Sequence, residues 1–162
     1  MDFWNSSSGK NSSMSILSSG HLFPPSKYQL KKGDIFRFDG GCIYNKYHAD
    51  FGGCAVLGAA NKKQEKCYKA IETGMEKAMK LLKPGAFPSK IFQEIIITVE
   101  KEGLKDFSKI TTNCGHGIGI EPRDYPFIGK AEKINSPFLP RGYDIPIEKD
   151  MVINIEIPYK EL

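Results

Sequence analysis

Alternation of apolar and polar side chains predicts two short strands in the first third of the chain. Residues 34–39 alternate as a half-buried strand does, with Gly33 before them and Gly40-Gly41 after them. Residues 43–50 read as a second strand, and Gly52-Gly53 is expected to loosen the chain that follows. Two short strands with a tight connection predict an antiparallel pair.

From residue 62 the apolar positions recur with a period of 3.6, which predicts two helices. The first covers 62–83 and stops at Lys83-Pro84-Gly85; its expected buried face is Cys67, Ile71, Met75, Ala78 and Leu82. The second runs from Pro88, suited to a first turn, to Gly103, suited to the position after a helix. Its expected buried residues are Ile91, Phe92, Ile95, Ile96 and Val99.

The rest of the chain indicates further extended structure. A glycine-rich segment at 115–120 is followed by a long polar connection with Pro137, Pro140 and Pro146, and then by a strand at 151–157. A strand pair, two helices and more strands predict an α+β fold with mostly antiparallel pairing. A chain of 162 residues with 40% hydrophobic residues is expected to form a single domain, 1–162, around one apolar core.

Composition and charge exclude several function classes. The net charge of +4 comes from lysines spread along the chain, without the dense basic stripe and interleaved aromatics that nucleic-acid binding favours. The Ser- and Asn-rich segment 1–20 has no apolar core of a secretory signal, and the longest aliphatic run, 95–97, is too short to span a bilayer. The four cysteines show no CxxC pairing, so we expect thiols in a reducing cytoplasm, with neither nucleic acid nor membrane as a partner.

Two aspartates are the first candidates for chemistry. Asp39 ends a strand of otherwise apolar character, and Asp50 lies eleven residues later, near the end of the partner strand. Two carboxylates aimed into one site repel each other unless a cation holds them. The alternative is that both are ordinary aspartates in turns at strand ends.

A histidine and a glutamate extend the candidate set. His116 stands between glycines in Gly115-His116-Gly117-Ile118-Gly119, so its ring is open to close approach. Glu156 alternates with isoleucines and therefore shares a strand face with Asn154. The alternatives are that His116 is a histidine in a glycine-rich turn with its hydrogen bonds already made, and that Glu156 faces solvent on an edge strand. Together, Asp39, Asp50, His116 and Glu156 offer the oxygen and nitrogen ligands that suit Mn, Co, Fe or Zn, without the clustered thiols of a structural zinc site.

At these positions the chain resembles the pita-bread metallopeptidases, which include methionine aminopeptidase, Xaa-Pro aminopeptidase and prolidase. The resemblance extends from about Ser13 to the C-terminus. It rests on four segments in the family's order: 30–40 with Asp39, 47–50 with Asp50, 115–119 with His116, and 151–156 with Glu156. The two intervening helices and the turn at Lys83-Pro84-Gly85 also match. A pita-bread fold is therefore expected, with a curved, mostly antiparallel sheet and helices packed on its outside.

The resemblance implies a site for two divalent cations that share a water or hydroxide. Asp39 would bind one cation, Asp50 would bridge both, and His116 and Glu156 would bind the other, with Glu156 also placed to accept a proton from the nucleophile. Two cations acidify the shared water and stabilise the oxyanion. His21, eighteen residues before Asp39, matches a substrate-contacting histidine of the methionine aminopeptidase branch.

The chain also departs from the family pattern. Arg123 stands where a second histidine is usual, and it can stabilise an oxyanion but cannot carry protons near neutral pH. Gly52-Gly53-Cys54 replaces a Thr-Arg-Thr-like stretch. The family's fifth ligand is a glutamate on a later strand, and no residue before Leu162 corresponds to it. The N-terminal domain of prolidases also has no counterpart in this sequence. We therefore expect this chain to bind metal weakly and to be poorly active.

Three functions remain open from the sequence. The first is metal-dependent hydrolysis of the N-terminal peptide bond of a peptide substrate, with Xaa-Pro specificity indicated by residues 4–6 and 157–159. The second is a non-catalytic module that binds a peptide or a protein, and the third is a metal-free amidinohydrolase of the creatinase type. The fold alone does not decide between them. A homodimer is left open as the oligomeric state.

Overall fold

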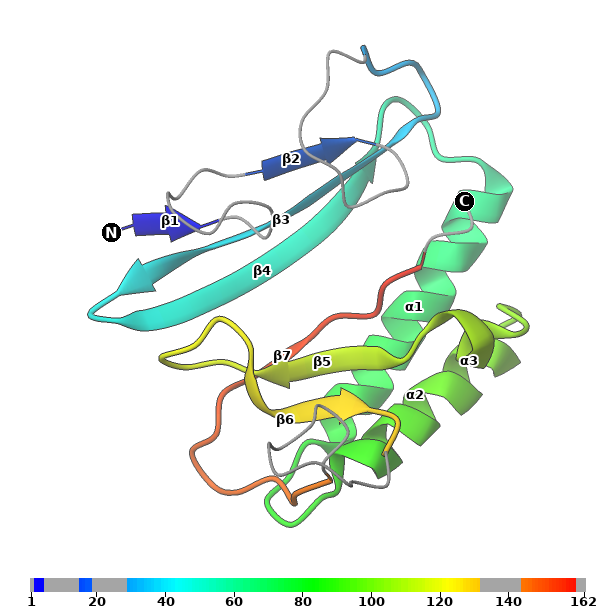
Figure 1. Ribbon diagram of the computed structural model, residues 1–162. Helices are drawn as coiled ribbons and strands as arrows, with labels where there is room; N and C mark the ends of the chain where they lie inside the picture. The colour runs from blue at the N-terminus through cyan, green and yellow to red at the C-terminus, as the bar shows by residue number, and fades with distance from the viewer. Residues whose placement is uncertain (1, 5–14, 19–28, 132–143, 160–162) are drawn as a thin grey trace. The chain divides into compact units, whose positions relative to one another are not determined.

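The computed structural model describes residues 2–4, 15–18, 29–131 and 144–159 (Figure 1). These residues form two compact units. The first comprises Met1–Glu65, Gly119–Pro122 and Lys160–Leu162, and the second comprises Lys66–Ile118 and Arg123–Tyr159. Among the described segments, none of the helices combines the length and the apolar character that crossing a bilayer needs.

The first unit is built on an antiparallel sheet around strand β3 (Ile35–Tyr44). Strand β4 (Tyr47–Val56) pairs with the whole length of β3. On the opposite edge of β3 the pairing is shared by two short strands. Strand β1 (Asp2–Trp4) pairs with Gly41–Ile43, and β2 (Ser15–Ser18) pairs with Phe36–Asp39.

The position predicted for the turn between the two strands was wrong. Strand β3 continues through Gly40-Gly41, and the chain reverses at Asn45 and Lys46, which have φ values of 49° and 72°. Two residues in the left-handed region make a turn whose twist matches that of paired strands, and asparagine adopts this conformation readily. Gly53 does not loosen the chain either. It lies within β4, where a Cβ would come 2.8 Å from the ring of Phe38 on the paired strand.

The second unit contains a three-stranded antiparallel sheet and three helices. Strand β5 (Asn113–Gly117) is central, with β6 (Asp124–Gly129) on one side and β7 (Ile153–Ile155) on the other. The helices are α1 (Lys62–Leu81), α2 (Pro88–Lys101) and the short α3 (Phe107–Ile110). The sequence pattern did not predict β6, because Pro126 interrupts its alternation and proline is a poor strand residue.

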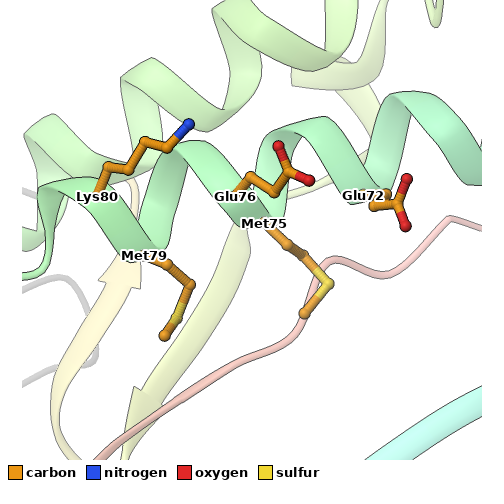
Figure 2. Close-up of a pocket in the computed structure, with 5 residues that line it drawn as sticks. All are labelled: Glu72, Met75, Glu76, Met79 and Lys80. Atoms are coloured by element: carbon orange, nitrogen blue, oxygen red, sulfur yellow. The ribbon is translucent and has the colours of Figure 1, made fainter.

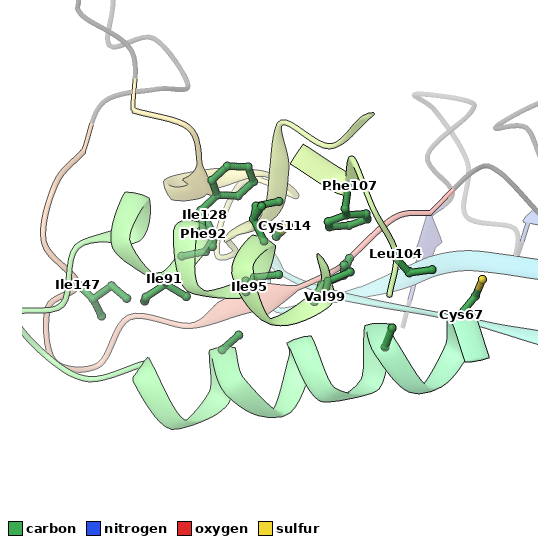
Figure 3. Close-up of a cluster of buried hydrophobic side chains, with 14 residues drawn as sticks. Cys67, Ile91, Phe92, Ile95, Val99, Leu104, Phe107, Cys114, Ile128 and Ile147 are labelled. Carbon is green, nitrogen blue, oxygen red and sulfur yellow. The ribbon is translucent and has the colours of Figure 1, made fainter. Parts of the chain in front are cut away.

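The predicted buried face of α2 is confirmed, and that of α1 is partly wrong. The five residues predicted for α2 are all buried. Helix α1 instead buries Cys67, Ala70, Gly74 and Ala78, whereas Met75 is 39% exposed. The reason is close packing: a Cβ at Gly74 would lie 2.6 Å from Val99 and 3.3 Å from Ile157, so small residues face the core. Figure 3 shows this core, in which α2 side chains, Phe107, Cys114 and Ile128 meet.

The outer face of α1 carries the methionines. Met75 and Met79 project from the same side of the helix (Figure 2). With Glu72, Glu76 and Lys80 they line a surface hollow of about 550 Å³. Long, flexible methionines are tolerated on this face because the small residues of the opposite face make the core contacts.

The start of α2 is fixed by a residue far away in the sequence. Pro88 occupies the first turn, as predicted, and Phe87 at the N-cap provides no side-chain hydrogen bond. The carboxylate of Asp144 takes over this role, accepting hydrogen bonds from the backbone N–H of Ser89 (2.9 Å) and from its hydroxyl (2.7 Å). At the other end, Gly103 has φ +102°, the left-handed conformation expected of it.

Candidate metal centre

Asp39 and Asp50 lie on one face of the β3–β4 hairpin. Asp39 pairs with Gly52, and Asp50 pairs with Gly41. Directly paired residues point to the same face, and so do residues two apart on a strand, so both carboxylates project from the same side as diagonal neighbours. Residues in this diagonal relation lie about 7–8 Å apart, so side chains that extend from them on the same face can reach a shared ligand. Both aspartates are well inside their strands rather than at strand ends, because the turn lies further along the chain than predicted.

Glycine at position 52 keeps the space beside Asp39 clear. A Cβ there would lie 3.9 Å from Oδ1 of Asp39 and 3.0 Å from the carbonyl oxygen of Phe38. A bulkier residue would therefore stand against the first carboxylate of the candidate site. This gives a physical reason for the Gly52-Gly53 pair.

His116 lies on β5, the central strand of its sheet, and is buried, with 1% of its surface exposed. It pairs with Phe127 on β6 and with Asn154 on β7. The sequence had suggested that the flanking glycines leave the ring of His116 open to close approach. In the structure these glycines instead allow the backbones of the neighbouring strands to lie close to β5. A Cβ at Gly115 would overlap the carbonyl oxygen of Asn154, and one at Gly117 would overlap that of Tyr125.

The hydrogen bond of the His116 ring prepares it for ligation. Its Nδ1 lies 2.8 Å from the carbonyl oxygen of Gly117. Because a carbonyl oxygen only accepts, Nδ1 carries the hydrogen in the neutral ring, and Nε2 keeps its lone pair. Histidines that bind metals have this arrangement in most proteins, with the other ring nitrogen donating to a carbonyl or carboxylate. The donor chemistry of His116 therefore fits a divalent cation.

Glu156 lies beside that nitrogen. Its backbone N–H donates to the carbonyl oxygen of Cys114 (3.2 Å), which continues the β5–β7 pairing one residue beyond β7. Since Asn154 pairs with His116, Glu156 shares the face of the histidine ring, in agreement with the parity predicted from the sequence. Its Oε1 lies 3.7 Å from Nε2 of His116, so a carboxylate oxygen and an imidazole nitrogen converge.

Arg123 approaches the same carboxylate. Its Nη2 lies 3.5 Å from Oε1 of Glu156, and both side chains are partly exposed, at 45% and 35%. One oxygen of Glu156 thus has a histidine on one side and a guanidinium on the other. Asp124, the next residue, has no such contact; its Oδ1 accepts from the backbone N–H of Tyr125 (2.7 Å).

Cys114 stands next to this site but is not equipped to act in it. Burial, together with the negative charge of Glu156, raises the pKa of its thiol from 9.0 to about 12. A thiol with that pKa is protonated at neutral pH, and only the thiolate serves as nucleophile or metal ligand. Cys114 is therefore not one of the candidate ligands.

The described residues provide two pairs of ligand-type side chains, Asp39 with Asp50 in the first unit and His116 with Glu156 in the second. Within the part of the chain that the structure describes, no group of three or more His, Cys, Asp and Glu side chains gathers into a metal cluster. That the two pairs share their cations is part of the proposal below. His21, the predicted substrate-contacting residue, lies outside the described residues.

Comparison with known proteins identifies the family. Residues 3–161 match metallopeptidase family M24. The chain belongs to this family. The match covers nearly all of the sequence, so the resemblance seen in the four motif segments is confirmed.

Similar proteins of the family fall into two groups by name. The chain is 27% identical over 143 residues to a Xaa-Pro dipeptidase of Pyrococcus furiosus, covering 85% of this chain and 40% of that protein. It is 30% identical over 128 residues to a methionine aminopeptidase of Buchnera aphidicola, covering 79% of this chain and 48% of that protein. The chain thus spans less than half the length of these two relatives.

Solved structures confirm the fold. The prolidase of Pyrococcus furiosus superposes with a TM-score of 0.72 at 24% identity, covering 88% of this chain and 40% of that one. A methionine aminopeptidase of Thermotoga maritima gives a TM-score of 0.66 at 23% identity, covering 86% of this chain and 53% of that one. The α+β pita-bread fold predicted from the sequence is therefore confirmed.

Proposed function

We propose that the two units form one catalytic domain, in which Asp39, Asp50, His116 and Glu156 hold two divalent cations. The protein then hydrolyses the N-terminal peptide bond of peptides. The observation that carries this proposal is the convergence of an imidazole nitrogen and a carboxylate oxygen, Nε2 of His116 lying 3.7 Å from Oε1 of Glu156. The same-face arrangement of Asp39 and Asp50 supports it from the other unit.

The four residues have different tasks in this proposal. Asp39 would hold one cation, Asp50 would serve both, and His116 and Glu156 would hold the second. When bound, the cations would lower the pKa of a water and offset the negative charge that develops on the carbonyl oxygen of the peptide. Glu156 would accept a proton from the nucleophile, Arg123 would stabilise the oxyanion, and His21 would contact the substrate. The hydrogen bond from Nδ1–H to the carbonyl oxygen of Gly117 favours the tautomer with the hydrogen on Nδ1 and orients the ring of His116.

The charges of the four ligands favour divalent cations. Three carboxylates contribute three negative charges and the imidazole none, against four positive charges on two divalent ions. A further carboxylate would complete the balance. The oxygen-rich ligand set also suits manganese, which we propose as the working metal.

For the substrate we propose a Xaa-Pro peptide. The Xaa-Pro dipeptidase and prolidase among the relatives support this choice, and the methionine aminopeptidases stand as the competing specificity. We further propose a cytoplasmic location, which the lack of CxxC pairs among the four cysteines supports, and a homodimer as the assembly to be tested.

Paired substitutions test the function. With added manganese and a Xaa-Pro dipeptide, Asp50→Ala should abolish hydrolysis by the full-length protein, because it removes the carboxylate that would serve both cations. Asp124→Ala is the control, since the Asp124 carboxylate is exposed and accepts only from its neighbour Tyr125 in the described contacts. Equal losses from the two changes would refute the site as drawn. Faster cleavage of a peptide that begins with methionine would assign the competing specificity.

One observation favours a second candidate function, a non-catalytic module that binds a peptide or protein. Glu156 already has a cationic partner in Arg123, as the carboxylate of a metal-free site would. Such a module would bind peptides without added metal and without cleaving them. Calorimetric titration of a Xaa-Pro peptide, with and without manganese, distinguishes the two functions.

A further inference from the structure

Arg123 and a metal ion would use the same oxygen of Glu156. We propose that Arg123 is an internal counter-cation that competes with a divalent cation for Oε1 of Glu156 and thereby sets the metal affinity of the site. The inference rests on the proposed function, since it concerns the same ligands. It gives Arg123 a role toward the metal, in addition to any contact with the substrate.

The geometry places the two cations in competition. Oε1 of Glu156 lies 3.5 Å from Nη2 of Arg123 and 3.7 Å from Nε2 of His116. A divalent ion ligated by that oxygen and that nitrogen would therefore stand only a few ångströms from the guanidinium. Like charges at that separation repel, so the guanidinium has to move away for the ion to bind with full affinity.

The ion pair is suited to being displaced. Arg123 is 45% exposed and Glu156 is 35% exposed, and exposed ion pairs contribute little stability. Arg123 lies in the connection between β5 and β6, and its flexible side chain can turn into solvent without unfolding a strand. The guanidinium also stays charged throughout the physiological pH range, so the competition does not depend on proton uptake.

Coulomb's law gives the size of the effect. A divalent cation about 5 Å from a single positive charge, in the dielectric of water, corresponds to roughly a 15-fold difference in affinity. Screening at about 0.15 M salt reduces this to roughly fivefold. Removing the charge of Arg123 should therefore tighten metal binding, and the gain should shrink as the salt concentration rises.

The test is a calorimetric titration with manganese on four proteins: the wild type, Arg123→Gln, Arg123→Lys and Lys90→Gln. Lys90 is a matched control, an exposed cation on α2 of the same unit, whose Nζ donates to Oε1 of Gln93 (3.4 Å). We expect Arg123→Gln to bind manganese about 15-fold more tightly at low salt and about fivefold more tightly at 0.15 M. Arg123→Lys and Lys90→Gln should stay within about twofold of the wild type, because the first retains the charge and the second changes an exposed charge whose described contact is with Gln93.

The outcomes separate this inference from the proposed function. Equal affinities in all four proteins, weaker binding by Arg123→Gln, or equal gains from Gln and Lys would overturn the role of Arg123 and leave the metal site standing. Absence of binding in all four would overturn both. Thermal melts of the variants accompany the titrations. If Arg123→Gln does not fold, Arg123→Ala takes its place with the same expected gain, and an Arg123→Ala affinity equal to that of the wild type at low salt would overturn the role of Arg123.

Discussion

Replacing Gly115 by alanine tests whether the close pairing of β5 and β7 holds His116 beside Glu156. A Cβ at position 115 would overlap the carbonyl oxygen of Asn154 and lie 3.2 Å from the Cα of Ile155. Both are main-chain atoms of β7, which cannot rotate away as a side chain can. Gly115 also has φ +149°, a conformation that residues with a side chain rarely adopt.

The two effects give the expected magnitude. Backbone strain of this kind costs roughly 1–3 kcal/mol, and overpacking against fixed atoms costs about 1–3 kcal/mol more. Gly115→Ala should therefore lower the free energy of unfolding by about 2–6 kcal/mol, which for a chain of this size lowers the melting temperature by roughly 4–24 °C. Gly119→Ala is the matched control in the same motif: nothing lies within 4 Å of its Cβ position. It should change stability by less than about 1 kcal/mol.

Thermal unfolding followed by far-ultraviolet circular dichroism measures both variants. Manganese titration of the folded Gly115→Ala protein then reports on the metal site, and binding should weaken because the strand that leads to Glu156 is pushed away from β5. Melting temperatures of the two variants that agree within about 2 °C would refute the close β5–β7 contact on which this reasoning depends.

Two further predictions concern residues around the site. Asp144→Ala should lower the free energy of unfolding, measured in urea, by about 1–2 kcal/mol, because it removes the hydrogen-bond acceptor at the start of α2. Asp144→Asn keeps an acceptor oxygen and should cost less. Equal losses of stability from the two variants would contradict the capping role. At pH 8, Cys114 should react with iodoacetamide far more slowly than the exposed Cys54, because burial and the negative charge of Glu156 raise the pKa of the Cys114 thiol to about 12 and keep it protonated. Similar labelling of the two cysteines by mass spectrometry would refute the burial of Cys114. Because the pKa of Cys114 is raised in the folded state, the stability contributed by its protonated thiol is fully present below about pH 9 and is lost as the pH rises toward 12. The difference in unfolding free energy between wild type and Cys114→Ala should therefore shrink over that interval.

The sequence predicted the elements and ligands that depend on local pattern. The period of α2 was strong enough to identify its core residues and both ends. The alternation around Glu156 gave its face relative to Asn154, because side-chain parity in a strand follows directly from sequence position. The eleven-residue spacing of Asp39 and Asp50 was recognised as a motif, and the register now explains why that spacing brings both to one face of the hairpin.

Other features depend on contacts between distant residues and could not be predicted. The turn at Asn45-Lys46 was missed because Gly40-Gly41 is the stronger local signal for a break. Met75 was assigned to the core because periodicity does not distinguish it from Gly74, whose close approach to Val99 decides which residues face inward. The cap from Asp144 lies 55 residues from Ser89, and the contact of Arg123 with Glu156 spans 33 residues. Neither leaves a local sequence signal.

The measurement that tests the central proposal most directly is anomalous diffraction from crystals of the protein soaked in manganese. We predict two peaks, with Oδ atoms of Asp39 and Asp50, Nε2 of His116 and Oε1 of Glu156 at about 2.0–2.3 Å from one or both of them. The guanidinium of Arg123 should have left Glu156 in that structure. Manganese bound only elsewhere, or any one of the four side chains on the opposite surface of the domain, would contradict the proposed site and the activity that depends on it.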